Sequence, residues 1–200
     1  LNTGNGGAIW TTQTLGTTSP FASVHFTDAQ TGWAVGASGT ILKTSNGGAT
    51  WAAQSSGAMN GLESVYFIDA QTGWVVGDFG TILKTSNGGV NWIVQTAGTS
   101  FDLTSVYFED AQTGWAAGDN GTILKTSNGG TTWTAQTSGT TNIIRSIHFI
   151  DALTGWVVGR NGIILKTSNG GSNWTMQTSG TTNWFTSVFF TDAQTGWIVG

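Results

Sequence analysis

Short apolar segments alternate with polar turns along the whole chain, and residues 99–139 show the pattern clearly. Residues 105–108, 115–118, 122–126 and 132–136 are rich in β-branched and aromatic side chains, which favour strands. Asp, Asn and Gly separate these segments, and Asn120-Gly121 is typical of a hairpin turn because both residues tolerate positive φ. No segment has the 3.6-residue apolar period of a helix. The pattern predicts short antiparallel strands and essentially no helix.

The same pattern recurs every 41 residues. A Gly-Trp pair marks each copy, with the tryptophans at Trp33, Trp74, Trp115, Trp156 and Trp197. A period near 40 residues with four strands per repeat is typical of propeller blades. The sequence therefore predicts a single all-β domain, a β-propeller of five four-stranded antiparallel blades. The predicted blades are residues 17–57, 58–98, 99–139, 140–180, and 181–200 plus 1–16.

The two terminal segments complement each other. Residues 1–16 align with the third turn and fourth strand of a repeat, and residues 181–200 with its first two strands. Five positions of the repeat are missing, all in the turn between strands two and three. We expect the two segments to share one blade and close the ring, because open sheet edges template aggregation. A monomeric five-bladed ring is the simplest arrangement, and a larger ring of two chains is the alternative.

Composition excludes several classes of partner. The net charge is −4 and no stretch concentrates Lys or Arg, so nucleic acid and anionic membrane surfaces are not expected partners. The apolar runs are far too short for membrane insertion. The chain has no cysteine, which removes disulfides, thiolate nucleophiles and cysteine metal sites.

The third turn of the repeat carries a recognisable motif. Residues 44–51 read Thr-Ser-Asn-Gly-Gly-Ala-Thr-Trp and resemble the Asp-box, or bacterial neuraminidase repeat. With the preceding Asp-Ala-Gln-Thr-Gly-Trp and Gly-Thr-Ile-Leu-Lys-Thr segments, the whole repeat is similar to the propeller family of the photosystem II stability and assembly factor. The resemblance implies a non-enzymatic assembly scaffold. Because the family has many secreted bacterial relatives, it also implies an extracytoplasmic location, whether secreted, periplasmic or on the cell surface.

The chain departs from the Asp-box at one position. Asparagine stands where the family has aspartate, at Asn5, Asn46, Asn87, Asn128 and Asn169. The amide oxygen can still accept backbone N–H bonds within the turn, but it is a poorer calcium ligand than a carboxylate. We expect the boxes, and the tryptophan that ends each one, to be scaffolding. No metal or other cofactor is predicted.

The side chains that neuraminidase chemistry requires are missing. Such enzymes clamp the substrate carboxylate with three arginines, whereas this chain has only Arg145 and Arg160. Its other candidate groups share one repeat position in strand one and are explained by strand packing: His25, Tyr66, Tyr107 and His148. We therefore predict no catalytic residues and no enzyme activity.

Lysine and aspartate also recur once per repeat. The lysines are Lys43, Lys84, Lys125 and Lys166, and the aspartates of the first turn are Asp28, Asp69, Asp110, Asp151 and Asp192. Their closeness in the blade plan predicts a ladder of surface ion pairs, and an anion-binding ring is the alternative.

Differences between the copies gather in two loops, the crossover between blades and the turn between strands two and three. An up-and-down blade places both loops on one face, and binding residues commonly lie on loops of rigid scaffolds. Trp184 is the one tryptophan outside the repeat pattern. The candidate ligand-binding residues on this face are Trp184, Arg145, Glu63, Phe79, Phe101, Asp102 and Arg160.

Three functions follow from this pattern. The first is a non-enzymatic binding or assembly propeller whose varied face receives a protein or peptide. The second is a carbohydrate-binding, lectin-like propeller. The third is a recently amplified or engineered repeat without a selected ligand, which the near-identity of the copies favours.

Overall fold

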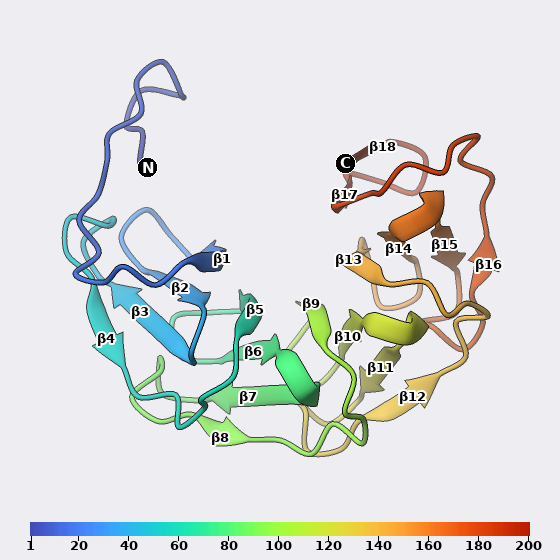
Figure 1. Ribbon diagram of the computed structural model, residues 1–200, viewed down its shortest axis with the longest axis horizontal. Coiled ribbons are helices and arrows are strands. Elements are labelled where there is room, and N and C mark those ends of the chain that lie inside the picture. Colours follow the sequence, from blue (N-terminus) through green and yellow to red (C-terminus); the bar gives the residue numbers. More distant parts are fainter.

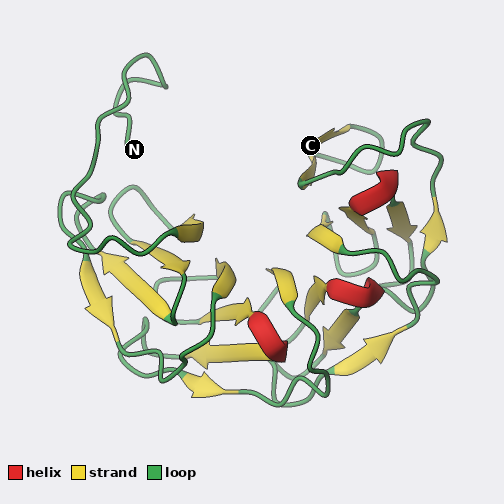
Figure 2. Cartoon of the chain, in the orientation of Figure 1, coloured by secondary structure: helices red, strands yellow, loops and turns green.

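The computed structural model describes residues 1–200 as an arc of antiparallel sheets (Figures 1 and 2). The first sheet comprises β1 (Phe21–Phe26), β2 (Gly32–Gly36), β3 (Thr40–Thr44) and β4 (Ala52–Gln54). The second comprises β5 (Leu62–Phe67), β6 (Gly73–Gly77), β7 (Thr81–Thr85) and β8 (Ile93–Val94). The third comprises β9 (Leu103–Phe108), β10 (Gly114–Gly118), β11 (Ile123–Thr126) and β12 (Thr134–Gln136). The fourth comprises β13 (Ile144–Phe149), β14 (Gly155–Gly159), β15 (Ile164–Thr167) and β16 (Thr175–Met176), and a two-stranded sheet follows, β17 (Ser187–Phe190) and β18 (Gly196–Val199).

Each complete sheet runs up and down in chain order, with every strand bonded to the next. The predicted all-β class and four-stranded blade are therefore confirmed. Helical geometry is confined to three one-turn 3-10 segments in the turns between strands two and three, Asp78–Gly80, Asp119–Gly121 and Arg160–Gly162. Within one of them Asn120 and Gly121 have φ values of 54° and 65°, as a turn built on Asn-Gly requires. No helix has the length and apolar character needed to span a membrane.

The core lies between blades rather than inside one. Strand β6 is buried along its whole length, whereas the outer strand β8 is exposed. The ring of Trp74 stacks on Phe108 of the next blade with centroids 3.5 Å apart, and its Nε1 donates to the carbonyl oxygen of Gly129 at 3.1 Å. The pair recurs as Trp33 on Phe67. Because the apolar surface of each blade is covered by the next blade, a single repeat is not stable alone and depends on its neighbours.

The inner strands are joined by a second repeated contact. The backbone N–H of Val106 donates to the hydroxyl oxygen of Ser64 in the preceding blade at 3.3 Å. The same bond links Ile147 to Ser105 and Val188 to Ser146. These bonds and the aromatic stacks fix each blade relative to the next one.

The predicted sharing of one blade by the two termini is not present in the structure. Strands β17 and β18 pair only with each other, and the N- and C-terminal ends lie apart across the mouth of the arc (Figure 1). Residues 1–16 instead lie against the first blade, with a single bridge between Asn2 and Thr11. The physical reason is that packing sets the step between blades, and the accumulated steps do not bring the ends together. Residues 1–16 and the β17–β18 hairpin therefore each form a partial blade at one end of the arc.

Candidate functional site

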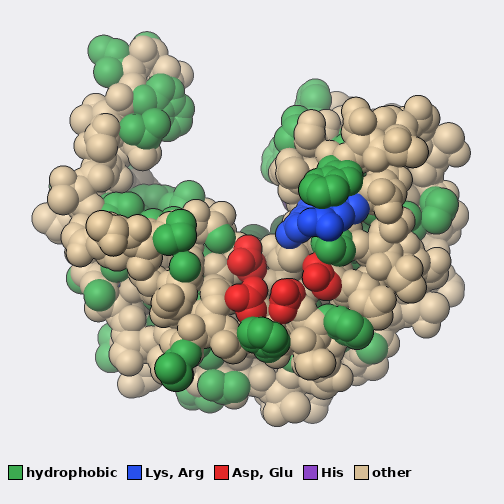
Figure 3. Space-filling model, in the orientation of Figure 1, with side chains coloured by type: hydrophobic (Ala, Val, Ile, Leu, Met, Phe, Trp, Pro, Cys, Tyr) green, Lys and Arg blue, Asp and Glu red, His purple; other side chains and the backbone are tan.

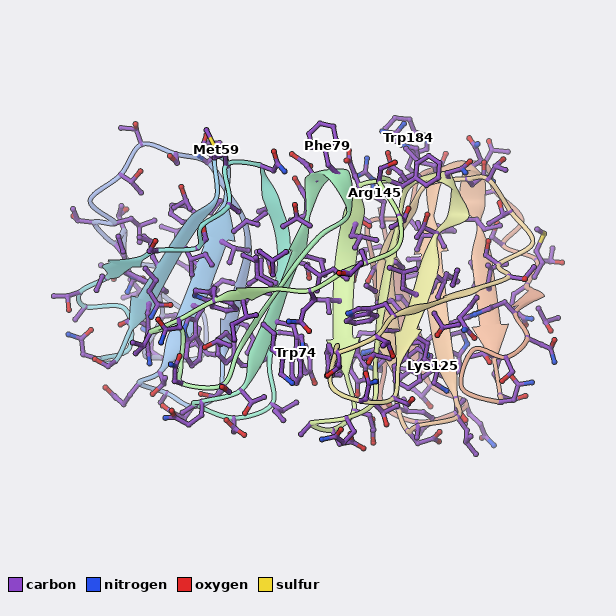
Figure 4. All side chains as sticks on the ribbon, turned by 90° about the horizontal axis from the view of Figure 1, so that it is seen from below. Met59, Trp74, Phe79, Lys125, Arg145 and Trp184 are labelled. Carbon is purple, nitrogen blue, oxygen red and sulfur yellow. The ribbon has the colours of Figure 1, made fainter.

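The two faces of the arc carry different turns. Figure 4 shows Met59, Phe79, Arg145 and Trp184 along one edge of the blades and Trp74 and Lys125 toward the other. We call the first edge the varied face, formed by the crossovers and the turns between strands two and three. The second is the box face, formed by the Asp and Asp-box turns. The sequence-based expectation that the varied loops share one face therefore matches the structure.

On the box face, side chains of each turn accept hydrogen bonds from backbone N–H groups of the same turn. The hydroxyl of Thr126 accepts hydrogen bonds from the backbone N–H groups of Asn128 and Gly130 at 3.3 and 2.8 Å. The Oδ1 of Asn128 accepts the backbone N–H of Thr132 at 2.9 Å. Asparagine thus performs the structural role expected for the box, and the turn is scaffolding.

The predicted ion pairs between the repeated lysines and aspartates do not form. The Nζ of Lys43 donates to the carbonyl oxygen of Gly88 at 3.0 Å and lies 5.0 Å from the ring centroid of Trp33. The Oδ1 of Asp28 accepts the backbone N–H groups of Gln30 and Thr31 at 2.6 and 2.8 Å. Each charged group has a nearer partner within the scaffold, because the turn amides and the box carbonyls are fixed in place.

The box tryptophans pack as predicted, with an exception at the N-terminal end. Trp92 contacts Phe67 edge to face, with centroids 5.9 Å apart, and Trp133 makes the same contact with Phe108. Trp10 is exposed, because residues 1–16 lack the two inner strands of their blade. The repeated strand-one side chains form an aromatic row along the inner strands, in which the Tyr66 and Tyr107 centroids lie 5.2 Å apart.

Large apolar side chains project from the varied face. Trp184 is 55% exposed and Phe79 is 69% exposed. Phe101, also predicted, is 46% exposed and lines an open depression of about 780 Å³ with Asn120 and Gln136. Sequence reasoning missed Met59, which is 90% exposed. Its equivalents in other copies are Thr or Ser, so comparison of the repeats could have found it.

Acidic side chains gather on the same face beside an arginine (Figure 3). Burial and the negative charge of Asp78 raise the pKa of Glu63, while the positive charge of Arg145 opposes the rise. Asp102 also acts on Glu63, and its Oδ1 accepts the backbone N–H of Phe79 at 2.8 Å. Glu63, Asp102 and Arg145, predicted separately, therefore form one electrostatic group across three blades.

Arg160 contacts Trp184, the tryptophan that lies outside the repeat pattern. The guanidinium carbon of Arg160 lies 4.1 Å from the ring centroid of Trp184. The Nε of Arg160 is covered and has no hydrogen-bond partner. This cation–π contact holds the indole and the guanidinium together as one amphipathic platform.

Phe79 occupies a backbone conformation that a phenylalanine rarely adopts. Its φ of 55° lies in the left-handed region, where the corresponding residues are Ser38, Asn120 and Asn161. A residue with a Cβ is sterically disfavoured in this region, and asparagine is disfavoured least. The turn therefore presents an exposed aromatic ring at a conformational cost.

The varied face combines exposed aromatic rings with charged side chains. No group of three or more His, Asp or Glu side chains gathers to hold a metal ion. His148 lies among the inner aromatic rings, where burial lowers its pKa. Exposed aromatic rings beside arginine and carboxylate groups suit recognition of a polypeptide.

Comparisons with known proteins agree on a family and a fold. A family model described as Photosynthesis system II assembly factor YCF48 matches residues 5–94, 59–137, 93–178 and 135–200. A solved structure titled YCF48 bound to D1 peptide aligns with a TM-score of 0.75 and 21% identity, covering 92% of this chain and 62% of that chain. The chain thus spans less than two thirds of that relative. No curated protein matches at a significant level.

Further solved structures share the fold. YCF48 from Cyanidioschyzon merolae aligns with a TM-score of 0.55 and 16% identity, covering 92% of this chain and 94% of that chain. A GH74 enzyme from Niastella koreensis aligns with a TM-score of 0.67 and 18% identity, covering 80% of this chain and 32% of that chain. At these identities the likenesses show the propeller fold alone.

Proposed function

Since the chain belongs to the Photosynthesis system II assembly factor YCF48 family, we propose that it is a non-enzymatic scaffold that binds a peptide segment of another protein through its varied face. One observation carries the proposal: Trp184, Phe79 and Arg145, which differ from their repeat equivalents, lie on the same face of the scaffold. The turns on the opposite face form hydrogen bonds within themselves. The similar structure of a YCF48 protein with a D1 peptide supports a peptide as the class of ligand.

The energetics of the face suit such a partner. Arg and Trp are enriched among the residues that dominate binding energy at protein interfaces. Here they form the stacked pair Arg160 and Trp184, and side chains held in contact before binding lose less conformational entropy when a ligand binds. Phe79 adds a second aromatic contact, and its unfavourable φ supports a role outside folding.

The charges favour a peptide of mixed polarity. Glu63, Asp78 and Asp102 form an acidic group that suits a Lys or Arg side chain of the ligand. Arg145 and Arg160 suit a carboxylate. A carbohydrate ligand is not favoured by any observation specific to this chain, since the GH74 likenesses extend only to the fold.

Binding of a fluorescent D1 peptide, measured by anisotropy, tests the proposal. Trp184→Ala removes the stacked platform, and we expect the Kd to rise at least about tenfold, as for truncation of an interface hot spot. Ile93→Ala on β8 is the matched control, because Ile93 is also exposed and apolar but lies on an outer strand. Its Kd should stay within about twofold of that of the unaltered chain.

Two results would count against the proposal. If Trp184→Ala and Arg145→Ala both bound as tightly as the unaltered chain, the varied face would not be the binding surface. If the unaltered chain failed to bind the peptide, a D1-type segment would be rejected as its ligand.

A further inference from the structure

Eight asparagines of this chain are followed directly by glycine. Five of them are the box asparagines, and the other three lie in loops of the varied face: Asn60, Asn120 and Asn161. An asparagine before glycine readily loses its side-chain amide, because glycine has no side chain to hinder attack of its own nitrogen on the asparagine Cγ. Since the following residue is the same at all eight positions, their reactivities depend on the structure around each one.

In the boxes, both reacting groups are held by hydrogen bonds. The Oδ1 of Asn128 accepts the hydroxyl of Thr126 at 3.0 Å and the backbone N–H of Thr132 at 2.9 Å. The backbone N–H of Gly129 donates to the carbonyl oxygen of Gln112 at 2.8 Å. The same glycine bond to the first turn recurs in the other complete blades, from Gly47, Gly88 and Gly170. Attack at these asparagines would therefore have to break several bonds.

Asn60 and Asn5 are also held through their side chains. The Nδ2 of Asn60 donates to the hydroxyl oxygen of Thr81 at 3.4 Å, and the backbone N–H of Gly61 donates to the Oδ2 of Asp78 at 3.1 Å. Asn5, in the partial blade at the N-terminal end, keeps a box bond through its Oδ1.

Asn120 and Asn161 occupy the same position in the turn between strands two and three. Their φ and ψ values are 54° and 32° for Asn120 and 57° and 33° for Asn161, and both residues are exposed. The Nδ2 of Asn161 donates to the Oδ1 of Asn142 at 3.0 Å. The backbone N–H of Gly162 donates to the carbonyl oxygen of Asn183 at 2.8 Å. Two bonds therefore tie the Asn161 turn to neighbouring crossovers.

Asn120 lacks both of these bonds. The bond that Gly162 makes to a crossover has no counterpart at Gly121. Phe101 takes the repeat position of Asn142, so the side chain of Asn120 finds no acceptor there and makes no hydrogen bond. Asn120 thus shares its backbone conformation with Asn161 but not the contacts that hold it.

The turn must open before the reaction can occur. At a ψ of 32° the nitrogen of Gly121 points away from the side chain of Asn120, so the backbone must rotate to bring it to Cγ. Opening breaks the turn bond from the backbone N–H of Thr122 to the carbonyl oxygen of Asp119. The Asn161 turn has the corresponding bond and its two crossover bonds besides. Local opening therefore requires less free energy at Asn120.

We propose that Asn120 is a site of spontaneous deamidation that reacts while the rest of the fold stays intact. The backbone nitrogen of Gly121 forms a bond to Cγ of Asn120 and gives up its proton, and the side-chain nitrogen takes up a proton and leaves as ammonia. Water then adds to either carbonyl of the resulting succinimide ring and one C–N bond breaks. The product is aspartate or isoaspartate at position 120.

The product changes the varied face. It adds a negative charge to the lining of the depression that Asn120 shares with Phe101, and the isoaspartate form adds a methylene to the backbone of the turn. No ligand takes part in the reaction, so this site is independent of the proposed peptide binding.

Peptide mapping by mass spectrometry, after incubation of the folded chain at mildly alkaline pH, tests the proposal. Trypsin cleavage after Lys84, Lys125 and Arg160 places Asn120 and Asn161 in different peptides, and fragment ions assign each site. Because each hydrogen bond that opening must break slows the reaction severalfold, we expect the rate at Asn120 to exceed that at Asn161 at least about tenfold. In a chain unfolded in guanidinium chloride, the eight asparagines should react at similar rates.

Asn142→Ala tests whether the hydrogen bonds set the rate. It removes the acceptor of the Asn161 side chain, so the rate at Asn161 should rise severalfold while that at Asn120 stays the same. The circular dichroism spectrum of this variant should match that of the unaltered chain. A folded, unaltered chain in which Asn120 reacts no faster than Asn161 would overturn the proposal. An unchanged rate at Asn161 in the variant would count against it too, since the bonds would then not control the reaction.

Discussion

Trp74 lies toward the box face and Trp184 lies on the varied face, and the two tryptophans differ in burial. Both rings carry a cation, since Lys84 Nζ lies 5.3 Å from the Trp74 centroid and Arg160 Cζ lies 4.1 Å from that of Trp184. Trp74 is fully buried, stacked on Phe108 and bonded through Nε1, whereas Trp184 remains more than half exposed. The comparison teaches that a cation–π contact is buried within the scaffold on the box face, whereas on the varied face it stays exposed where we propose that the peptide binds.

The largest expected effect separates the two tryptophans by stability. Trp74→Ala leaves a cavity between two blades and an unpaired Gly129 carbonyl, so we expect it to lower the free energy of unfolding by about 3–5 kcal/mol. Trp184→Ala should lower it by less than about 1 kcal/mol, because most of the ring already faces solvent. Urea unfolding followed by circular dichroism measures both values. Equal losses would contradict the division into scaffold and binding tryptophans.

The box face was largely predictable because its contacts are local. The first turn at Asp110, the strand around Trp115 and the box at Thr126 each follow from a few neighbouring residues. The grouping of the varied loops followed from the up-and-down order of the strands.

The rest depends on the angle between blades, which no local pattern specifies. That angle places Arg160 over Trp184 and brings Glu63 near Asp102 and Arg145. It also keeps the two ends of the arc apart, which is why the expected shared blade is absent. The lysine partners were missed for a related reason, since the carbonyl of Gly88 that binds Lys43 belongs to the next blade.

A smaller effect of opposite sign is expected at Phe79. Replacing it with glycine removes the cost of holding a Cβ at a φ of 55°, and little burial is lost. Because glycine is freer in the unfolded chain, the net gain in unfolding free energy should be about 0.5–1 kcal/mol. Asn120→Gly in the next blade is the matched control and should gain less, since asparagine tolerates this region. A destabilised Phe79→Gly variant would show that the ring contributes to folding rather than to binding.

The smallest expected effect is a difference in how the two faces respond to acid. On the box face, backbone N–H bonds from Gln112 and Thr113 hold the pKa of Asp110 below its usual 3.8. A carboxyl group with a lowered folded-state pKa stabilises the fold above its unfolded-state pKa, and this contribution disappears as the pH falls through the folded-state value. On the varied face, burial and then Asp78 raise the pKa of Glu63 above 4.5. Its ionised form therefore destabilises the fold at neutral pH, and protonation relieves the cost as the pH falls.

Unfolding free energies measured from about pH 6 to about pH 3 resolve this difference. Asp110→Asn should be less stable than the unaltered chain at the upper end, with the gap closing in acid. Glu63→Gln should be more stable at the upper end, and its advantage should vanish as the unaltered Glu63 becomes protonated. Parallel curves for the two variants would show that carboxylates on both faces experience the same environment, which the bonds to Asp110 and the charge of Asp78 beside Glu63 argue against.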